Sequence, residues 1–224
     1  MRRDIITSAI GIVVLTLMLG ILYPLVITGI SQVAFPGNAN GQQIKLHGKL
    51  VGSKIIGQQF ADQVVKHGKP QVDKNGNPVT VPDPRYFQTR PSATVPADNA
   101  AASAFSNAGP NNIATEQAIA ANIQAYIALD KAPNGTPYYP GGLTAAKAPV
   151  DAADTSASGI DPDISPANAD IQAHRIATVR KLSLSRVMSL ISTYTHGRGL
   201  GFSGEPGVNV LQLNLALDRV TGGR

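Results

Sequence analysis

A long uncharged stretch near the N-terminus constrains this chain more than any other feature. No Asp, Glu, Lys or Arg occurs from Ile5 to Ile30, and the next charged residue is Lys45. A helix through the hydrocarbon core of a bilayer needs about 20 apolar residues, so this stretch of roughly 26 is long enough to span. Pro24 removes one backbone donor inside the stretch, which predicts a kink in the outer part of the helix.

The chain is long enough for one anchor and one domain with a core of its own, since it has 224 residues. We place the boundary between residues 1–34 and residues 35–224. The alternative is a cleaved signal peptide, but its apolar core would be shorter and a small-x-small cleavage site would follow. Gly37-Asn38-Ala39 fits such a site only loosely, beside Pro36. A retained anchor is therefore the favoured interpretation.

The positive charges at the N-terminus predict the orientation of this anchor. Arg2 and Arg3 precede the apolar stretch, and basic residues flanking a membrane helix stay on the cytoplasmic side. The domain after the anchor is then expected on the outer, periplasmic face of the cytoplasmic (inner) membrane, where no steady ATP supply exists.

Composition excludes several functions. The chain has no Cys, which rules out disulfides, thiolate metal sites and thiol nucleophiles. The four His residues are far apart, with no pair at helical spacing. The net charge is +5, but the basic residues are scattered and do not alternate with aromatics, so nucleic-acid binding is not expected.

The patterning after the anchor predicts one mixed α+β domain. Helices are expected at 113–130, where Asn112 is a plausible N-cap, after the Ser165-Pro166 pair, and from Ser183 to His196-Gly197. A strand-like stretch is expected at 49–60, and alternating leucines predict a half-buried strand at 208–217. The remaining segments are interpreted as an exit loop at 35–41, a surface hairpin or insertion at 63–84 with Asn75-Gly76 at a turn, and a long loop at 131–159.

No motif for catalysis emerges. Phosphate-binding loops, the phosphorylated Asp of ion pumps and the Gly-x-Ser-x-Gly elbow of hydrolases have no match. Asp161-Pro162-Asp163 could suggest a calcium-binding site, but the favoured interpretation is a turn that leads to the N-cap at Ser165. Arg175 is interpreted as a solvated helix edge, with an interface contact as the alternative, and Arg90 as a loop anchor rather than a ligand clamp.

Several segments, in this order along the chain, together resemble one family. They are Tyr23-Pro24-Leu25, residues 35–41, residues 52–60, Tyr86-Phe87-Gln88-Thr89-Arg90-Pro91-Ser92-Ala93, residues 158–166 and residues 204–218. Together they closely resemble the C subunit of the bacterial high-affinity potassium-transporting ATPase, the Kdp-type complex. The sequence departs from the family pattern at Ala104-Phe105, where a Gly-Gly is expected, and at the insertion 63–84.

The resemblance implies an accessory subunit without chemistry or cofactors of its own. ATP and K⁺ would be handled by its partners: a channel-like potassium-binding subunit, a P-type ATPase subunit and a small single-helix subunit. Two roles are attributed to such subunits, a catalytic chaperone for ATP use by the pump subunit and a periplasmic cap at the potassium entrance. Such a subunit is also expected to stabilise the assembly.

The resemblance and the residue types together suggest contact residues. Pro24, Thr28 and Gly29 suit helix packing in the membrane, because small residues let backbones approach closely. Gln172 is the candidate for a nucleotide contact. Partner contacts are expected in turn-rich polar segments, at Gly57, Gln58, Arg90, Ser92, Asp161 and Ser165.

Two other classes of function stay open from the sequence. The first is a free-standing membrane-anchored envelope module for binding or assembly. The second is an anchored hydrolase, since serines are abundant and a Ser-His-Asp arrangement need not be local in sequence.

Overall fold

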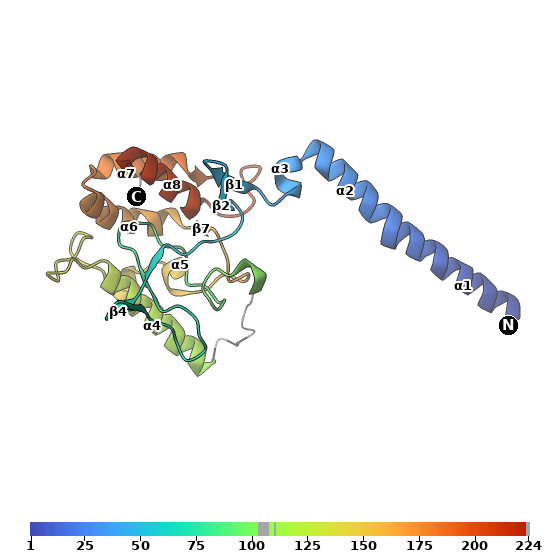
Figure 1. Ribbon diagram of the computed structural model, residues 1–224, viewed down its shortest axis with the longest axis horizontal. Helices are drawn as coiled ribbons and strands as arrows, with labels where there is room; N and C mark the ends of the chain where they lie inside the picture. The colour runs from blue at the N-terminus through green and yellow to red at the C-terminus, as the bar shows by residue number, and fades with distance from the viewer. Residues whose placement is uncertain (103–107, 110, 223–224) are drawn as a thin grey trace. The chain divides into compact units, whose positions relative to one another are not determined.

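The computed structural model describes residues 1–102, 108–109 and 111–222. Ala104 and Phe105, where the sequence departs from the family pattern, lie outside the described residues. The chain divides into two compact units, Met1–Ser53 and Lys54–Arg224, and each is described by itself (Figure 1).

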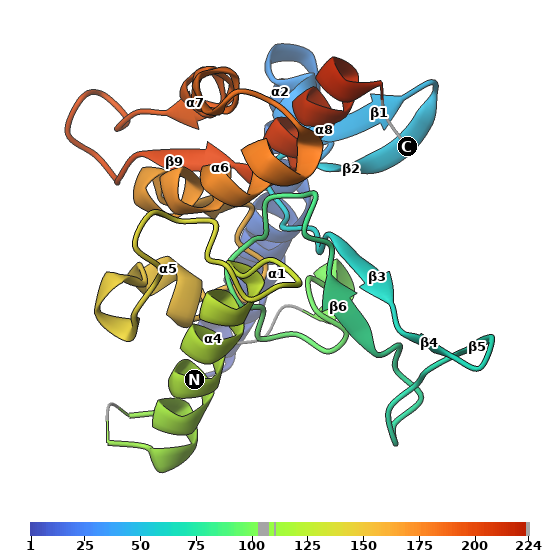
Figure 2. The same ribbon diagram turned by 90° about the vertical axis from the view of Figure 1, so that its left-hand side faces the viewer.

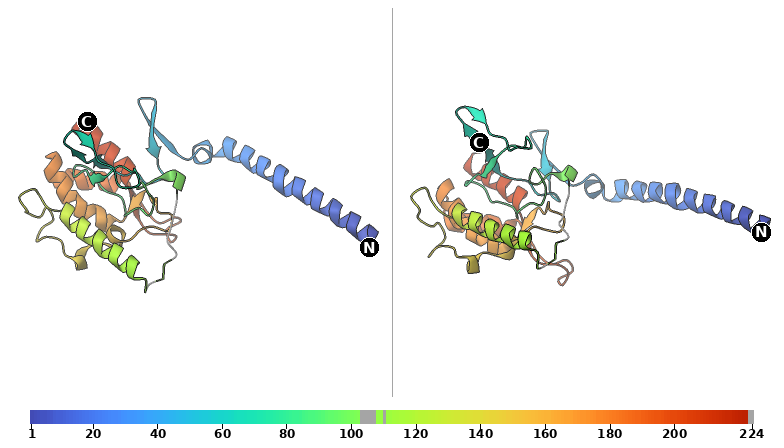
Figure 3. Two further views of the ribbon diagram at one scale, coloured as in Figure 1. Left: turned by 60° about the horizontal axis from the view of Figure 1, so that its bottom comes forward. Right: turned by 90° about the horizontal axis from the view of Figure 1, so that it is seen from below.

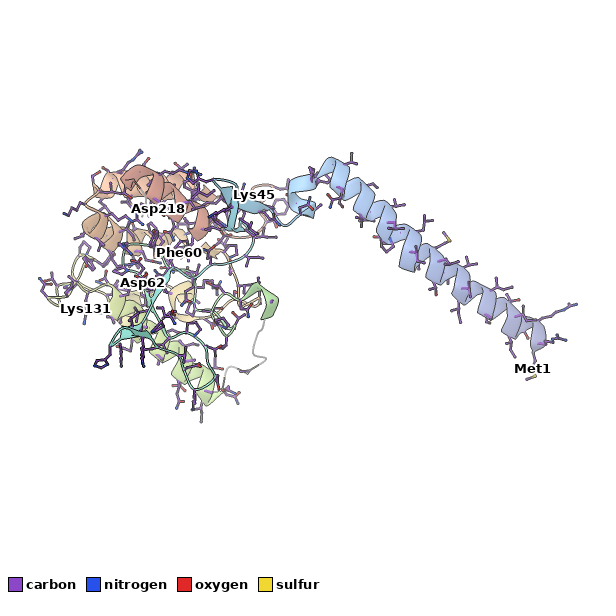
Figure 4. The ribbon with its side chains drawn as sticks, in the orientation of Figure 1. Met1, Lys45, Phe60, Asp62, Lys131 and Asp218 are labelled. Carbon is purple, nitrogen blue, oxygen red and sulfur yellow. The ribbon has the colours of Figure 1, made fainter. Side chains whose placement is uncertain are left out.

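The first unit begins with the apolar helix. It comprises α1 (Arg2–Leu17), the π-helical turn η1 (Met18–Leu22) and α2 (Tyr23–Ala34). The whole helix is long and apolar enough to cross a membrane. None of its residues is buried, and its side chains project on all sides in Figure 4. The wide turn η1 ends at Leu22, two residues before Pro24, and a proline ring in a regular helix would clash with the carbonyl group one turn earlier.

The first unit ends with a short helix and a hairpin. The helix α3 (Pro36–Ala39) replaces the exit loop expected from the sequence, because Pro36 sits at its first position, where the missing N–H costs nothing. Strands β1 (Gln43–Leu46) and β2 (Lys49–Ser53) pair antiparallel. The strand expected at 49–60 is therefore only half as long, and its second half forms a turn followed by extended chain.

The core of the second unit is formed by three helices and a small sheet. The helices are α6 (Pro166–Arg180), α7 (Leu184–Thr193) and α8 (Val210–Thr221), grouped together in Figure 1. The sheet has the order β7 (Asp163–Ile164), β9 (Gly207–Asn209) and β8 (Thr195–His196), with antiparallel neighbours. One cluster of buried residues from these elements, together with Phe87, makes the hydrophobic core.

Side-chain caps fix where these helices begin. The hydroxyl of Ser165 accepts from Asn168 N, that of Ser183 accepts from Arg186 N, and Asn209 caps α8 in the same way. Such caps satisfy backbone donors that lack partners inside the helix. The caps expected at Ser165 and Ser183 are confirmed. The helix after Ser183 ends at Thr193, three residues before the expected His196, which instead belongs to β8.

The expected strand at 208–217 is wrong beyond its first two residues. Val210, Leu213, Asn214 and Leu217 are all fully buried, and their i, i+3, i+4, i+7 spacing is that of one helix face. The alternating leucines pointed to a strand because Asn214 was counted on a polar face. In the structure this asparagine belongs to the buried stripe of α8.

The remaining elements surround this core. Helix α4 (Ile113–Leu129), capped by Asn112 as expected, lies beside the core helices in both views of Figure 3. The long loop expected at 131–159 contains two short helical segments, η3 (Ala145–Lys147) and α5 (Val150–Ala153). One further helical turn, η2, covers Ala100–Ala102.

The expected hairpin region at 63–84 is present. It consists of β3 (Ala61–Gln63), β4 (Val65–Lys66), β5 (Lys69–Pro70) and β6 (Thr80–Pro82). Strand β3 pairs with β6 and β4 pairs with β5, and Figure 2 shows these ribbons extending away from the helices.

Candidate functional site

The segment of residues 83–92, called the extended segment, begins with a turn at 83–86 and then passes through the second unit without joining any sheet. Its backbone groups are satisfied by side chains instead. Phe87 N donates to Asn214 Oδ1 at 2.9 Å, and Asn214 Nδ2 donates to Phe87 O at 2.9 Å. Gln88 N donates to Gln172 Oε1 at 2.8 Å, and Gln172 Nε2 donates to Gln88 O at 3.1 Å. Amide side chains of α8 and α6 thus replace the neighbouring strands that a sheet would supply.

Gln172, the candidate nucleotide contact, has its hydrogen-bonding capacity used inside the domain. Besides the two bonds to Gln88, its Oε1 accepts from Arg175 Nη2 at 2.7 Å and its Nε2 donates to Asn168 Oδ1 at 2.9 Å. An amide has two donor hydrogens and two acceptor lone pairs, so all four positions are filled. A nucleotide could bond to Gln172 only by replacing one of these partners.

Arg175 is buried, with 2% of its surface exposed, and the expectation of a solvated edge is wrong. Its guanidinium donates to Pro84 O, Tyr86 O and Gln172 Oε1. Burial lowers the pKa of Arg175 to about 10, which still leaves the side chain charged at neutral pH. The five donors of a guanidinium suit this position, because three acceptors converge there from the extended segment and α6.

The side chain of Tyr86 contacts the C-terminal part of α8 at Asp218. Its neighbours Phe60 and Asp218 are labelled in Figure 4. Its hydroxyl group is 3.1 Å from both carboxylate oxygens of Asp218. The guanidinium of Arg180 stacks 4.4 Å from the Tyr86 ring centroid and bonds Asp218 at 2.8 Å. Phe60 packs on the same ring, with centroids 5.1 Å apart.

Four of the residues expected to contact partners meet in one place. Arg90 donates to the carbonyl oxygens of Asp154 and Thr155 and pairs with Asp161 at 3.4 Å. Gly57 N donates to Ile160 O. Ser92 Oγ donates to Gly159 O at 2.6 Å. The interpretation of Arg90 as a loop anchor agrees with these contacts, which tie the segment 154–161 to residues distant in sequence.

Gly57 shows how close this packing is. A Cβ atom at position 57 would lie 2.8 Å from Asp161 O, 3.1 Å from Asp98 Oδ1 and 3.2 Å from Ile160 O. Only glycine permits such an approach of two backbones. Gln58, the next residue, is half-buried.

Ser165 lies in a separate polar cluster at the start of α6. Asp151 of α5 accepts from Ser165 N at 2.7 Å and from Ser165 Oγ at 2.8 Å. It also accepts from Asn168 Nδ2 at 2.9 Å, and Asn168 Oδ1 accepts from the Tyr126 hydroxyl of α4 at 2.8 Å. This cluster links three helices, and Asp161-Pro162-Asp163 forms the turn that leads into it.

A cavity of about 290 Å³ lies between α4, α6 and the segment 88–98. Arg90, Ser92 and Gln172 line it, together with Asp98 and Tyr126, which the sequence did not single out. Burial raises the pKa of the Asp98 carboxyl group, against the lowering effect of the hydrogen bond from Thr89. Burial also raises the pKa of Tyr126.

The sequence offered one usable signal for Asp98. Val95-Pro96-Ala97-Asp98-Asn99 follows the Arg90-Pro91-Ser92 motif after two residues and has turn composition. Asp98 adopts a left-handed backbone, with φ 56°, a conformation in which Asp and Asn are enriched. Tyr126 gave no signal beyond helical spacing.

The membrane-packing candidates lie on α2. Pro24 and Thr28 are four residues apart and thus share a helix face, and Gly29 is next to Thr28. All three are exposed in the chain alone, and a Cβ atom at Gly29 would meet nothing within 4 Å. In the described ranges, no group of three or more His, Cys, Asp or Glu side chains could hold a metal ion.

These features define a class of protein. One apolar helix of membrane-spanning length precedes an α+β domain whose polar side chains mainly fix its own loops, which describes an anchored, scaffold-like protein.

Comparison with known proteins identifies the family. The family model "K+-transporting ATPase, c chain" matches residues 5–219. The chain is 45% identical to the potassium-transporting ATPase KdpC subunit of Methylococcus capsulatus, over 92% of this chain and 93% of that protein. It is 42% identical to the KdpC subunit of Herpetosiphon aurantiacus, over 98% of both chains, and 39% identical to that of Koribacter versatilis, over 97% and 95%. The chain belongs to the KdpC family of subunits of the K⁺-transporting ATPase.

Proposed function

We propose that this chain is a non-catalytic accessory subunit that stabilises a potassium-transporting ATPase complex from the outer side of the membrane. The observation that carries the proposal is the family match across residues 5–219, which includes both the apolar helix and the domain. Subunits of this kind would bind a channel-like subunit, a P-type ATPase subunit and a small single-helix subunit. ATP and K⁺ would be handled by those partners.

The orientation in this proposal rests on the charges beside the anchor. Arg2 and Arg3 stay in the cytoplasm by the positive-inside rule, and the domain then lies in the periplasm. Because the chain has no Cys, a single introduced thiol reports its own side of the membrane. Lys74→Cys, at the exposed hairpin turn, should react with a membrane-impermeant maleimide on spheroplasts. Asp4→Cys should react only after permeabilisation, and the reverse pattern would refute the orientation.

The role that the geometry supports best is a rigid cap beside the potassium entrance. The extended segment 83–92 and the loop 154–161 are held by side-chain contacts from α6, α8 and Arg90. A surface fixed in this way loses little conformational entropy when it binds, and this favours stable assembly.

An effect on ATP use fits this proposal only as an indirect one. Gln172, the nucleotide candidate, already has four hydrogen bonds within the domain. A domain outside the membrane would act on ATP affinity through its partner subunits, as a coupling free energy of typically about 1–3 kcal/mol.

Purification from mild detergent tests the proposal. A C-terminally tagged chain, expressed with the whole complex, should co-elute with a channel-like subunit and a P-type ATPase and carry potassium-stimulated ATP hydrolysis. A chain that elutes alone and inactive would favour the free-standing envelope module. Hydrolysis of ester or peptide substrates by the chain alone, blocked by a serine-directed inhibitor, would favour the hydrolase.

A matched chimera separates the two parts of the chain. Replacement of residues 1–34 by an unrelated single-pass helix keeps the domain at the membrane. Full recovery of the complex would assign assembly to the domain, and partial recovery would assign a share to the anchor.

A further inference from the structure

The cavity beside Arg90 has partly apolar walls, and one carboxylate, that of Asp98, is in its lining. Its walls include side chains from β6, α4, α5 and the segment 88–98, namely Pro82, Pro91, Ala97, Ala125, Leu129 and Ala152. At about 290 Å³, it lies at the lower end of the roughly 300–1,000 Å³ range of ligand sites. This size suits one long side chain or a small molecule.

Asp98 is held firmly in the lining of this cavity. Its backbone N–H donates to Ser92 Oγ at 2.9 Å, and its backbone keeps the left-handed conformation at φ 56°. One carboxylate oxygen, Oδ2, accepts from Thr89 Oγ1 at 3.2 Å. The position of this carboxylate is therefore set by the protein and not by a ligand.

The carboxylate of Asp98 has acceptor capacity to spare. An ionised carboxylate offers about four lone-pair sites, and the hydroxyl group of Thr89 leaves part of this capacity unused. Within the part of the chain that the structure describes, Asp98 forms no ion pair. The nearby Arg90 pairs with Asp161 and with two carbonyl oxygens instead, and its buried Nε atom has no hydrogen-bond partner among the described residues.

We propose that this cavity binds an ammonium or guanidinium group on an aliphatic stem, with the cation at Asp98 and the stem along the apolar walls. Lysine and arginine side chains have this shape, since they bury their methylene stems and keep the charged head at a polar end. A charge-assisted hydrogen bond to a fixed carboxylate is stronger than a neutral one.

Anionic ligands are the competing class, because Arg90 also lines the cavity and its buried Nε atom has no hydrogen-bond partner among the described residues. The carboxylate of Asp98 repels phosphate and carboxylate groups, and Gln172, also in the lining, has no free donor to offer. The inference does not depend on the proposed role in the potassium-transporting complex, because it concerns a site within the domain.

Ligand-detected saturation-transfer NMR on the full chain in detergent micelles tests this site. The probe is Nα-acetyl-lysine methylamide, and the matched control probe is Nα-acetyl-norleucine methylamide, which lacks the ammonium group. The lysine probe should bind at least about tenfold more tightly than the norleucine probe, a difference typical of a lost charged contact. Equal binding of the two probes, stronger binding of acetate or ATP, or no binding of the lysine probe would overturn the proposal.

Variants assign the contact to Asp98. Asp98→Asn should abolish the preference for the lysine probe and keep the fold, because Asn adopts the left-handed backbone as readily as Asp. Ala125→Leu, which places extra methyl groups in the cavity, should weaken both probes. Asp73→Asn, which removes an exposed carboxylate in the hairpin turn, should change neither. An unchanged preference in Asp98→Asn would overturn the proposal.

A comparison of the lysine probe with putrescine, a free diamine, distinguishes the source of the cation. Tighter binding of the capped lysine than of putrescine supports a protein side chain as the natural occupant. Tighter binding of putrescine supports a diffusible amine. Either result agrees with the proposed ligand chemistry.

Discussion

The side-chain amide of Asn214 forms two 2.9 Å hydrogen bonds with the backbone of Phe87, one donated and one accepted. Gln172 forms the same pair of contacts with Gln88, the next residue. In extended chain the backbone groups of successive residues point to opposite sides. Residue 87 therefore faces α8, residue 88 faces α6, and the segment is held between the two helices.

Asn214→Asp should destabilise the domain strongly. The substitution removes the donor to Phe87 O and puts a carboxylate at a fully buried position. An unsatisfied buried carbonyl and a buried charge together should lower the free energy of unfolding by about 3–5 kcal/mol. Pulse proteolysis of the full chain across a urea series measures this, because it reports on the domain even when the anchor helix stays in detergent.

Asn112→Asp is the matched control for that change. Asn112 caps α4 by accepting from Thr115 N, and Asp is an equally good cap. Its stability should stay within about 0.5 kcal/mol of the original chain. Equal stability of both variants would show that the contact between Asn214 and Phe87 does not hold the extended segment.

Arg175→Met should also be costly. Met keeps much of the volume but leaves Pro84 O, Tyr86 O and Gln172 Oε1 without their shared donor. We expect a loss of about 3–5 kcal/mol in the free energy of unfolding, measured in the same way. Arg186→Met, the same exchange at an exposed position of α7, should cost less than about 0.5 kcal/mol. A loss below about 1 kcal/mol for Arg175→Met would contradict the role assigned to this guanidinium.

The sequence predicted those parts of the fold that local interactions determine. The caps at Asn112, Ser165 and Ser183 act within three residues, so their signals are readable in one sequence. Asn214 and Arg175 misled the interpretation because their partners are far away in the chain. A polar residue counts as exposed in a pattern, and only the folded structure shows that a distant backbone segment meets its hydrogen-bonding needs.

Single residues of the candidate site were also predicted from the sequence, but their arrangement in space was not. Gly57, Arg90 and Asp161 were chosen separately as polar or turn residues, and the fold brings them together at one point. The cavity could not be predicted, because it depends on how α4, α6 and the segment 88–98 pack, and the turn composition around Asp98 does not show that this residue lines a cavity. Whether these residues contact partner subunits stays a prediction.

Gly57→Ala should loosen the loop 154–161. Its Cβ would lie 2.8 Å from Asp161 O, and because that neighbour is backbone, the contact can be relieved only by moving the loop. We expect a loss of about 1–3 kcal/mol in stability, as for other overpacked sites, and faster proteolysis within 154–161. Gly197→Ala, where a Cβ meets nothing within 4 Å, is the control. Unchanged protease resistance in Gly57→Ala would show that the loop adapts without cost.

The pair of His196 and Asp163 should make stability depend on pH. His196 Nε2 lies 2.9 Å from Asp163 Oδ2, and this hydrogen bond raises the pKa of His196 above its ordinary value of 6.5. A raised folded-state pKa means that the stabilisation is complete below the unfolded-state pKa and is lost as the pH rises through the folded-state pKa. The effect should be small, because the histidine side chain is more than half exposed.

A double-mutant cycle checks this prediction. The stability difference between the original chain and His196→Gln should be largest below pH 6 and should shrink toward alkaline pH. In an Asp163→Asn background, His196→Gln should have no pH-dependent effect. If the dependence persists there, another group is responsible for it.

Pro24→Leu should weaken the complex and leave the domain intact. Leucine keeps the helix apolar, so insertion into the membrane is expected to continue. It restores the backbone donor, and the π-helical turn at Met18–Leu22 can then become a regular helix, which changes the face that α2 presents. A packing loss of about 1–2 kcal/mol would weaken subunit association by about 5–30-fold. Recovery of the partner subunits with the tagged chain, across a detergent series, measures this change. Val26→Leu, an apolar exchange without a backbone effect, should recover the complex fully, and equal recovery with Pro24→Leu would mean that the anchor is a simple tether.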